Sequence, residues 1–318
     1  MTEPRSGRAR TAVVGATGFL GRHVCQAVEQ AGHDLLGIAR APGANPPARQ
    51  FTAFDIAAAE PEDLAGLLRS QNITTVINTA GGWGRTEEDM VSAHVRLVQR
   101  LTAAAALNTA RGVAPLRVVQ VGSIHEYGPV PEGTAMDEWV SPKPVTRYGQ
   151  TKLAGSQEIL RAAGEGHVHG VVLRVVNVCG PRTTPASFLG TVVSRLRDIR
   201  PGQRLELSIA PARRDYVDVR DVARAVLLAA RAPLTARVVN VGRGEAVPIR
   251  DLLALLTEAA GLPPETLHET GGRVESRGGD WVQADIRLAR ELLDWTPRIG
   301  LRESMRDMWE AADATASV

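Results

Sequence analysis

The chain has 318 residues, 44% of them hydrophobic, and a formal net charge of +2. It is long enough to bury a full core and to form one large domain with a smaller companion. The arginines are spread among nearly as many acids, without a basic stripe or polybasic patch, so neither nucleic acid nor a membrane surface is a predicted partner. Cys25 and Cys179 lie far apart in apolar segments and are expected to be reduced core residues, with no metal site.

The N-terminus resembles a signal peptide only at first sight. Arg5, Arg8 and Arg10 precede a short apolar run, but three glycines followed by Arg22 interrupt this run well before it reaches the length of a targeting region. No stretch approaches the roughly 20 apolar residues needed to span a bilayer. We therefore expect residues 1–10 to be a disordered leader and the protein to be cytoplasmic.

A glycine-rich turn follows the first predicted strand, at residues 12–15. A strand that feeds such a turn at a helix N-terminus is typical of a pyrophosphate site, because glycines let the backbone approach and free N–H groups hold the anion. The spacing alone is also compatible with a tight turn that binds nothing, but the strand before it and the helical pattern over 19–31 favour a dinucleotide. The predicted contacts are Gly15, Thr17, Gly18, Phe19, Leu20 and Gly21.

The second predicted strand, at 34–39, ends in Ala39-Arg40. In dinucleotide-binding folds an acid at this strand end, about 20 residues past the glycines, holds the ribose 2′-hydroxyl, whereas an arginine accommodates a 2′-phosphate. The acid is absent here and Arg40 is present. The pattern therefore favours NADP(H), with NAD(H) as the alternative.

The next strands place further ligand contacts at the same edge. A third strand at 51–55 ends in Asp55-Ile56, which would lie near an adenine, although Asp55 could equally cap the helix predicted at 61–70. A buried strand at 75–79 leads into Ala80 and Gly81, where the backbone can pass close to a ligand.

Helices alternate with short apolar strands throughout the first half, including a long helix at 87–107 and a strand at 116–121 that leads to Ser123. This pattern predicts an α/β fold, a doubly wound parallel Rossmann sheet with right-handed crossovers and a ligand across the carboxyl ends of its strands. The predicted dinucleotide-binding domain covers residues 11–180.

Tyr148 and Lys152 are the strongest local signal of chemistry. If the segment is helical, residues four apart share a face, so the lysine ammonium lies beside the phenol. A neighbouring cation favours the ionised phenol, so Lys152 is expected to lower the pKa of Tyr148 and to ease proton exchange. Only two of the 37 basic residues are lysines, Lys143 and Lys152, which argues against a surface helix that holds this pair by accident.

Motifs of one family extend over nearly the whole chain. They are Gly15-x-x-Gly18-x-x-Gly21, Ser123 with Tyr127-Gly128, Tyr148-x-x-x-Lys152, the segments 173–181 and 214–219, and Asp285 with 292–297. Together they resemble the extended short-chain dehydrogenases/reductases, the group of nucleotide-sugar epimerases, dehydratases and ketoreductases. The resemblance implies a catalytic triad in which Ser123 hydrogen-bonds the substrate oxygen, Tyr148 passes the proton, and Lys152 binds the nicotinamide ribose.

The resemblance also implies that residues 181–318 form mainly a smaller α/β substrate domain, with some segments returning to the sheet. Asn177, Arg214 and Arg277 match positions that contact the nucleotide-sugar pyrophosphate, and a guanidinium suits phosphate by its bidentate geometry. Arg214 could instead belong to a solvated ion cluster. The likeness further implies a homodimer formed through the helices near 87–107 and 148–163.

Departures from the family pattern reduce the number of reactions that the resemblance allows. Ile124 and His125 stand where dehydratases place an Asp-Glu pair, so a 4,6-dehydratase is not expected, and His94 stands where many members have Asn. His125 and Glu126 could line a sugar pocket or could be ordinary loop residues, and both are left outside the catalytic set. Residues 128–144 are predicted to form a covering loop, with Trp139 shielding the site from water.

The sequence therefore predicts an NADPH-dependent ketoreductase that reduces the keto group, at C4, of a nucleotide-activated keto-deoxyhexose, dTDP-linked. The alternatives are an NAD-dependent nucleotide-sugar epimerase, a non-catalytic dinucleotide-sensing regulator, and a reductase of a non-sugar ketone. The preference for arginine over lysine, with abundant alanine, suggests a high-GC genome, consistent with deoxysugar and antibiotic biosynthesis.

Overall fold

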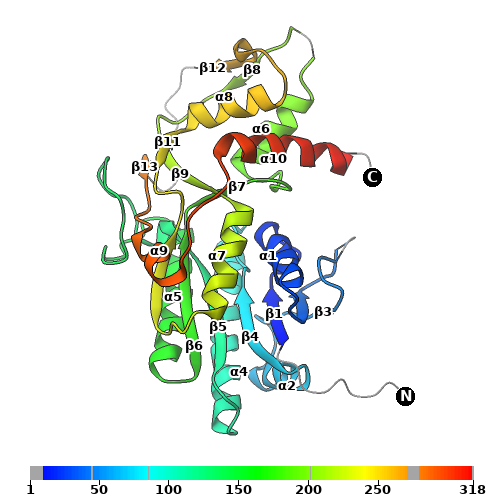
Figure 1. Ribbon diagram of the computed structural model, residues 1–318, viewed down its shortest axis with the longest axis vertical. Helices are drawn as coiled ribbons and strands as arrows, with labels where there is room; N and C mark the ends of the chain where they lie inside the picture. Colours follow the sequence, from blue (N-terminus) through cyan, green and yellow to red (C-terminus); the bar gives the residue numbers. More distant parts are fainter. Residues whose placement is uncertain (1–9, 44–45, 85, 201, 271–278, 317–318) are drawn as a thin grey trace.

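The computed structural model describes residues 10–43, 46–84, 86–200, 202–270 and 279–316. Within these residues, seven parallel strands form one sheet, shown in Figure 1. Across the sheet the strands are β10 (Arg237–Val241), β6 (Val168–Val175), β5 (Leu116–Ser123), β4 (Ile73–Asn78), β1 (Arg10–Val14), β2 (Leu35–Ala39) and β3 (Phe51–Ala53). The predicted doubly wound Rossmann fold is confirmed. Residues 1–9 of the predicted leader and Arg277 lie outside the described residues.

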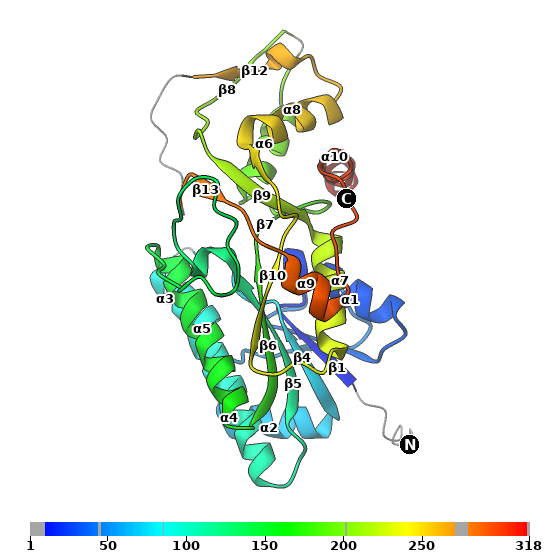
Figure 2. The same cartoon turned by 60° about the vertical axis from the view of Figure 1, so that its left-hand side comes forward.

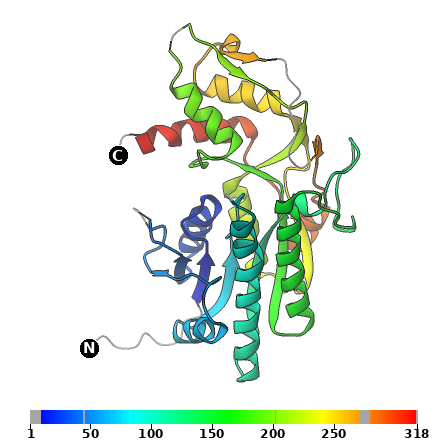
Figure 3. The same cartoon turned by 180° about the vertical axis from the view of Figure 1, so that it is seen from behind.

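Helices cover both faces of this sheet, as Figures 1 and 3 show from opposite sides. Their apolar faces form two separate clusters of buried side chains, one on each side of the sheet. On one face lie α2 (Pro61–Ser70), α4 (Leu97–Ala110) and α5 (Arg147–Gly164), and on the other α1 (Phe19–Gln30), α7 (Val219–Arg231) and α9 (Arg287–Leu293). Figure 2 shows α4 and α5 side by side, and the homodimer expected through these helices stays a prediction.

The long helix expected at 87–107 consists of three consecutive segments. These are α3 (Glu87–Val91), the π-helical turn η1 (Ser92–Arg96) and α4, which continues to Ala110. Thr86 caps the start, since its hydroxyl accepts the Asp89 N–H and the Asp89 carboxylate accepts the Thr86 N–H. π-Helical turns inside α-helices occur frequently at functional sites, and η1 carries His94.

A smaller lobe lies beyond the carboxyl ends of the sheet strands (Figure 1). Its third cluster of buried apolar side chains joins helices and short strands from the second half of the chain. The two halves interleave, since β10 and α7 come from this half but pack in the Rossmann sheet. The remaining elements are η2 (Ile124–Glu126), β7 (Asn177–Cys179), α6 (Phe188–Arg197), β8 (Leu205–Leu207), β9 (Arg213–Asp218), β11 (Ala246–Pro248), α8 (Ile249–Ala259), η3 (Pro264–Thr266), β12 (Leu267–Glu269), β13 (Trp281–Val282) and α10 (Leu301–Ala316).

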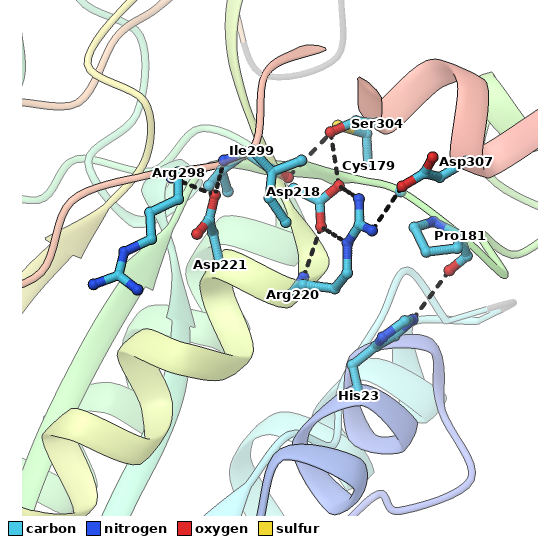
Figure 4. Close-up of polar contacts among 12 residues, drawn as sticks. His23, Cys179, Pro181, Asp218, Arg220, Asp221, Arg298, Ile299, Ser304 and Asp307 are labelled. Atoms are coloured by element: carbon cyan, nitrogen blue, oxygen red, sulfur yellow. Dashed lines mark hydrogen bonds and ion pairs between the residues drawn. The ribbon is translucent and has the colours of Figure 1, made fainter. Parts of the chain in front are cut away.

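A polar junction ties α7 to α10, as Figure 4 shows. The Asp218 side chain, which is 0% exposed, caps α7 by accepting the Arg220 backbone N–H at 2.8 Å. The Arg220 guanidinium bonds both carboxylate oxygens of Asp218 and reaches Asp307 of α10 at 2.6 Å. Ser304 donates its hydroxyl to Asp218 at 2.7 Å. The buried Asp218 carboxylate therefore bonds residues of both lobes.

Three further bonds in Figure 4 extend this junction. The Asp221 carboxylate accepts the backbone N–H groups of Arg298 and Ile299 at 2.8 and 2.9 Å, which fixes the chain just before α10. A ring nitrogen of His23, on α1, lies 3.0 Å from the Pro181 carbonyl oxygen, just after β7. The helix that follows the glycine turn is thus connected to the segment that leads into the smaller lobe.

Replacing Arg220 with methionine should lower the free energy of unfolding by about 2 kcal/mol. Breaking a fully buried ion pair costs roughly 3–5 kcal/mol, and partial exposure of Arg220 reduces this value. Urea unfolding followed by circular dichroism measures the change. The control is Arg306→Met, because Arg306 pairs with Asp307 from the exposed side of α10 and is expected to change stability by under about 1 kcal/mol. Equal losses in the two variants would contradict a special role of the junction.

Candidate active site

The structure brings Ser123, Tyr148 and Lys152 together at the carboxyl edge of the sheet. Ser123 is the last residue of β5, and Tyr148 and Lys152 lie on one face of the first turns of α5. The side chain of Thr146 begins this helix by accepting the Gly149 N–H at 3.1 Å. The Ser123 hydroxyl bonds the Tyr148 phenol and also accepts the His125 N–H at 3.3 Å. The catalytic roles of the three residues stay a prediction.

Burial dominates the ionisation of the pair on α5. It raises the pKa of Tyr148 to about 12, against the effect of the Ser123 hydrogen bond. It lowers the pKa of the Lys152 ammonium to about 8, with the Glu126 charge acting in the opposite direction. The prediction that Lys152 lowers the pKa of Tyr148 is therefore wrong for this structure. Lys152 is 3% exposed and donates from Nζ to the Val121 carbonyl at 2.7 Å, and the raised pKa of Tyr148 favours the protonated phenol at neutral pH.

Aromatic rings surround the phenol. Trp83, in the loop after β4, stacks on the Tyr148 ring with centroids 4.2 Å apart and planes 14° apart. His125 and His94 meet the same ring edge-on at 6.0 and 5.4 Å. Sequence reasoning missed Trp83, although a tryptophan among glycines at the end of a sheet strand was an available signal. Trp139 is 88% exposed, so the expected shielding by this residue is wrong, whereas Trp83 covers the phenol.

His125 lies beside Tyr148, and its ring is uncharged near neutral pH. Burial lowers its pKa to about 4, and the charge of Arg214 acts in the same direction. His125 can therefore act there only as a neutral hydrogen-bonding group.

His94 is buried next to Lys152. Its Nδ1 lies 2.8 Å from the Thr151 hydroxyl, which also contacts the Arg147 carbonyl at 3.0 Å. Nε2 makes no hydrogen bond of ordinary geometry with the described residues, although the Gly82 backbone is close enough to raise the pKa of the ring. Burial, helped by the Lys152 charge, nevertheless lowers this pKa to about 3.

The glycine turn fits a dinucleotide pyrophosphate. Gly15 has φ +77°, and a Cβ there would lie 2.8 Å from the Ala80 nitrogen. A Cβ on Gly21 would lie 2.1 Å from the Gly15 oxygen, so α1 packs tightly against the turn. Gly18 begins α1 without a side-chain cap, and no acid occupies the first turn, which contains Phe19 and Leu20. The first N–H groups of α1 are therefore available to an anion.

The nicotinamide end of a dinucleotide also has fitting partners. The Lys152 ammonium has donors beyond the one used by Val121, and the His94 ring lies next to it. The oxygens of a ribose diol can accept hydrogen bonds from such donors. These residues, with Tyr148, would hold the nicotinamide ribose.

Arg40 lies at the edge of the sheet next to the glycine turn. It is exposed and follows β2 directly, and β2 adjoins the glycine turn because the Gly15 N–H donates to the Ile38 carbonyl at 2.9 Å. The binding of a ribose 2′-phosphate by Arg40 stays a prediction.

The two predicted adenine contacts differ in their surroundings. Asp55 is exposed, and its carboxylate accepts the Ala57 N–H at 3.1 Å, so it caps the turn before α2. The Ile56 side chain is 2% exposed and packs in the core, which leaves only its backbone for a ligand. Asp55 therefore caps this turn and not the helix itself, since Glu60 is the N-cap of α2 and makes no side-chain cap, and the adenine contact of both residues stays a prediction.

The predicted substrate residues are only partly available. The Asn177 amide donates to the Asp215 carbonyl at 3.1 Å, which links β7 to β9. Arg214 is 9% exposed, donates to the Gly279 carbonyl at 3.0 Å and acts electrostatically on His125, so it is not part of a solvated cluster. Arg277 lies outside the described residues.

A Rossmann sheet with such an edge defines an enzyme class that uses a nicotinamide dinucleotide. The model of the NAD dependent epimerase/dehydratase family matches residues 11–242, and the chain belongs to this family. The dTDP-6-deoxy-L-talose 4-dehydrogenase (NAD(P)(+)) of Kitasatospora kifunensis is 40% identical over 322 residues, with 100% of both chains covered. The UDP-glucose 4-epimerase of Azospirillum brasilense is 27% identical, with 94% of this chain and 90% of the relative covered. The solved structure of MoeE5 in complex with UDP-glucuronic acid and NAD has a TM-score of 0.82 and 28% identity, covering 96% of this chain and 100% of that chain.

The family resemblance read from the motifs is thereby confirmed. Across the residues described, no helix combines the length and the apolar character that crossing a bilayer would take. The same part of the chain contains no group of three or more His, Cys, Asp or Glu side chains arranged to hold a metal ion.

Proposed function

We propose that the protein is an NADPH-dependent reductase of the C4 keto group of a nucleotide-activated keto-deoxyhexose. The observation that carries the proposal is the placement of the Tyr148 phenol, which is hydrogen-bonded to Ser123 and shares a helix face with the buried Lys152. A phenol that keeps its proton at neutral pH is the form that can donate to a carbonyl oxygen.

The residues of the chain would handle the charge that develops on the substrate oxygen. A bound dinucleotide supplies the hydride for the carbonyl carbon. Ser123 would hold the oxygen by a hydrogen bond, and Tyr148 would donate the proton that completes the alcohol. Both donors are in place before reaction, which is the condition for effective stabilisation of an alkoxide-like transition state. His125, neutral and adjacent, would contact a sugar hydroxyl.

The choice of C4 and of a dTDP-linked deoxyhexose is supported by the 4-dehydrogenase of Kitasatospora kifunensis, whose name places oxidation at C4 of a dTDP-6-deoxyhexose. Reduction of the corresponding 4-keto sugar is the reverse of that reaction. The test is to incubate the protein with NADPH and a panel of nucleotide-linked keto-sugars while following the absorbance of the nicotinamide. No turnover with any dTDP-4-keto-6-deoxyhexose would refute the substrate assignment.

The preference for NADPH is tested at Arg40. Arg40→Ala should weaken NADPH binding by about tenfold, because one charge-assisted phosphate contact of an exposed arginine is lost, and should leave NADH binding nearly unchanged. Fluorescence titration of the two dinucleotides measures both affinities. Arg49→Ala is the matched control, since Arg49 is an exposed arginine of the same connection but lies before β3 rather than after β2. Equal losses for NADPH and NADH would contradict the cofactor assignment.

An NAD-dependent epimerase is the second candidate, supported by the epimerases among the relatives. It makes a different prediction for the purified protein. An epimerase would carry bound nucleotide and interconvert nucleotide sugars without added cofactor, whereas a reductase consumes one NADPH for each sugar.

A further inference from the structure

A buried ion pair lies directly behind the serine of the site. Glu126, at the end of η2, is 0% exposed, and the Nε of Arg174 on β6 donates to its Oε2 at 2.8 Å. Its other oxygen, Oε1, accepts the Ser123 backbone N–H at 2.8 Å and the Ser156 hydroxyl at 2.9 Å. All three neighbours donate, so an ionised carboxylate satisfies them and an amide, with a single acceptor oxygen, cannot.

This carboxylate joins the two elements that carry the site. Ser156 lies on the face of α5 that also carries Tyr148 and Lys152, since the three residues are spaced four apart. Glu126 therefore connects the end of β5 to the working face of α5. The approach is close enough that a Cβ on Gly122 would lie 2.6 Å from Oε1, so the residue before Ser123 has to be glycine.

We propose that Glu126 is a positioning residue, which sets the spacing between Ser123 at the end of β5 and Tyr148 on α5. Its role in turnover rests on the proposed reduction, whereas its effect on Lys152 does not. Arg174 from β6 bonds the carboxylate, and the Tyr148 phenol and the Lys152 ammonium of α5 are the titratable groups on which its charge acts. Lys152 also faces His94 of η1, which burial keeps neutral.

The direction in which the Glu126 charge shifts the pKa values of its neighbours is known. The Glu126 charge raises the pKa of Lys152 and the pKa of Tyr148. Loss of this charge should therefore let the ammonium release its proton at lower pH. A buried group that only stabilised the fold would not shift this titration.

The experiment uses the low lysine content of the chain. Protein labelled with ¹³C at the lysine Cε gives signals from Lys143 and Lys152 only, and Lys143→Arg assigns them. In wild type the Lys152 signal is expected to titrate near pH 8 without any substrate. In Glu126→Gln the Lys152 signal should titrate at lower pH. The kcat of this variant should fall by about 10- to 100-fold, because the hydrogen-bond donors Ser123 and Tyr148 are misplaced. The pH above which its activity declines should also be lower than in wild type.

The matched control is Glu138→Gln, because the Glu138 carboxylate accepts the Asn240 backbone N–H at 2.7 Å and is not among the charges that shift the pKa of Lys152. This variant should leave the Lys152 titration unchanged. An unchanged titration in folded Glu126→Gln would overturn the proposal. If Glu126→Gln does not fold, the double variant Glu126→Met/Arg174→Met removes both buried charges, a change that proteins often tolerate, and is held to the same expectation. A shifted titration without reduction of any keto-sugar would retain the role of Glu126 and refute only the proposed substrate.

Discussion

Tyr148→Phe should lower kcat by about 10²- to 10⁴-fold, the range expected when a general acid is removed. The substitution keeps the ring that stacks on Trp83 at 4.2 Å and removes only the hydroxyl that bonds Ser123. Helix α5 and the Lys152 contact with Val121 should therefore persist, and NADPH should still bind. Steady-state turnover with a dTDP-4-keto-6-deoxyhexose and a fluorescence titration with NADPH measure the two quantities separately.

The matched control for this variant is Tyr127→Phe. Tyr127 is 2% exposed and donates its hydroxyl to Asn240 at 2.9 Å, so the same atom is removed from a neighbouring buried tyrosine. This change should cost about 1 kcal/mol of stability and leave kcat within a few-fold of wild type. Near wild-type turnover in Tyr148→Phe would remove the phenol from the proposed mechanism.

Lys152→Met should lower kcat/KM by about 10²- to 10³-fold and abolish the pH dependence that the ammonium causes. In wild type, kcat/KM should decline above about pH 8, because this parameter reports the free enzyme, in which the pKa of Lys152 is lowered to about 8 by burial. Rates measured between pH 6 and 10 test both statements. Lys143→Met, at an exposed lysine, is the control and should follow the wild-type profile.

The unfolding temperature of Lys152→Met shows whether this variant loses activity through its chemistry or through misfolding. Since the folded pKa of Lys152 lies below its unfolded value, the unfolded chain binds more protons between about pH 8 and 10.5, and this group makes folding more favourable as pH rises through that window. At neutral pH the buried ammonium therefore opposes folding. Lys152→Met should unfold at no lower temperature than wild type at pH 7, and a large drop would attribute its inactivity to misfolding.

Local patterns were sufficient for the sheet and for the side chains that share an element. The turn from Gly15 to Gly21 is encoded in seven consecutive positions that follow a strand and open a helix, so its place at the sheet edge follows from the fold class. The pairing of Tyr148 with Lys152 follows from helical spacing alone.

Depth of burial and contacts between distant segments could not be predicted in the same way. Helical spacing shows that Lys152 shares a face with Tyr148, but not that its Nζ turns to Val121 or that burial outweighs its charge. Glu126 is an unremarkable acid in the sequence, because its partners Ser156 and Arg174 lie 30 and 48 positions away. The sequence allows two interpretations of Arg214, a pyrophosphate contact or a member of a solvated ion cluster, and only the fold shows that its charge lies near His125.

The indole over the phenol has a practical consequence for studying this protein. Trp83 is 50% exposed and stacks on the Tyr148 ring, so a molecule that binds against this face of the phenol touches the indole or displaces it. Either event alters the emission of a natural fluorophore. Occupancy of the reaction centre can thus be followed optically without a dye or an isotope, even for compounds that are never converted.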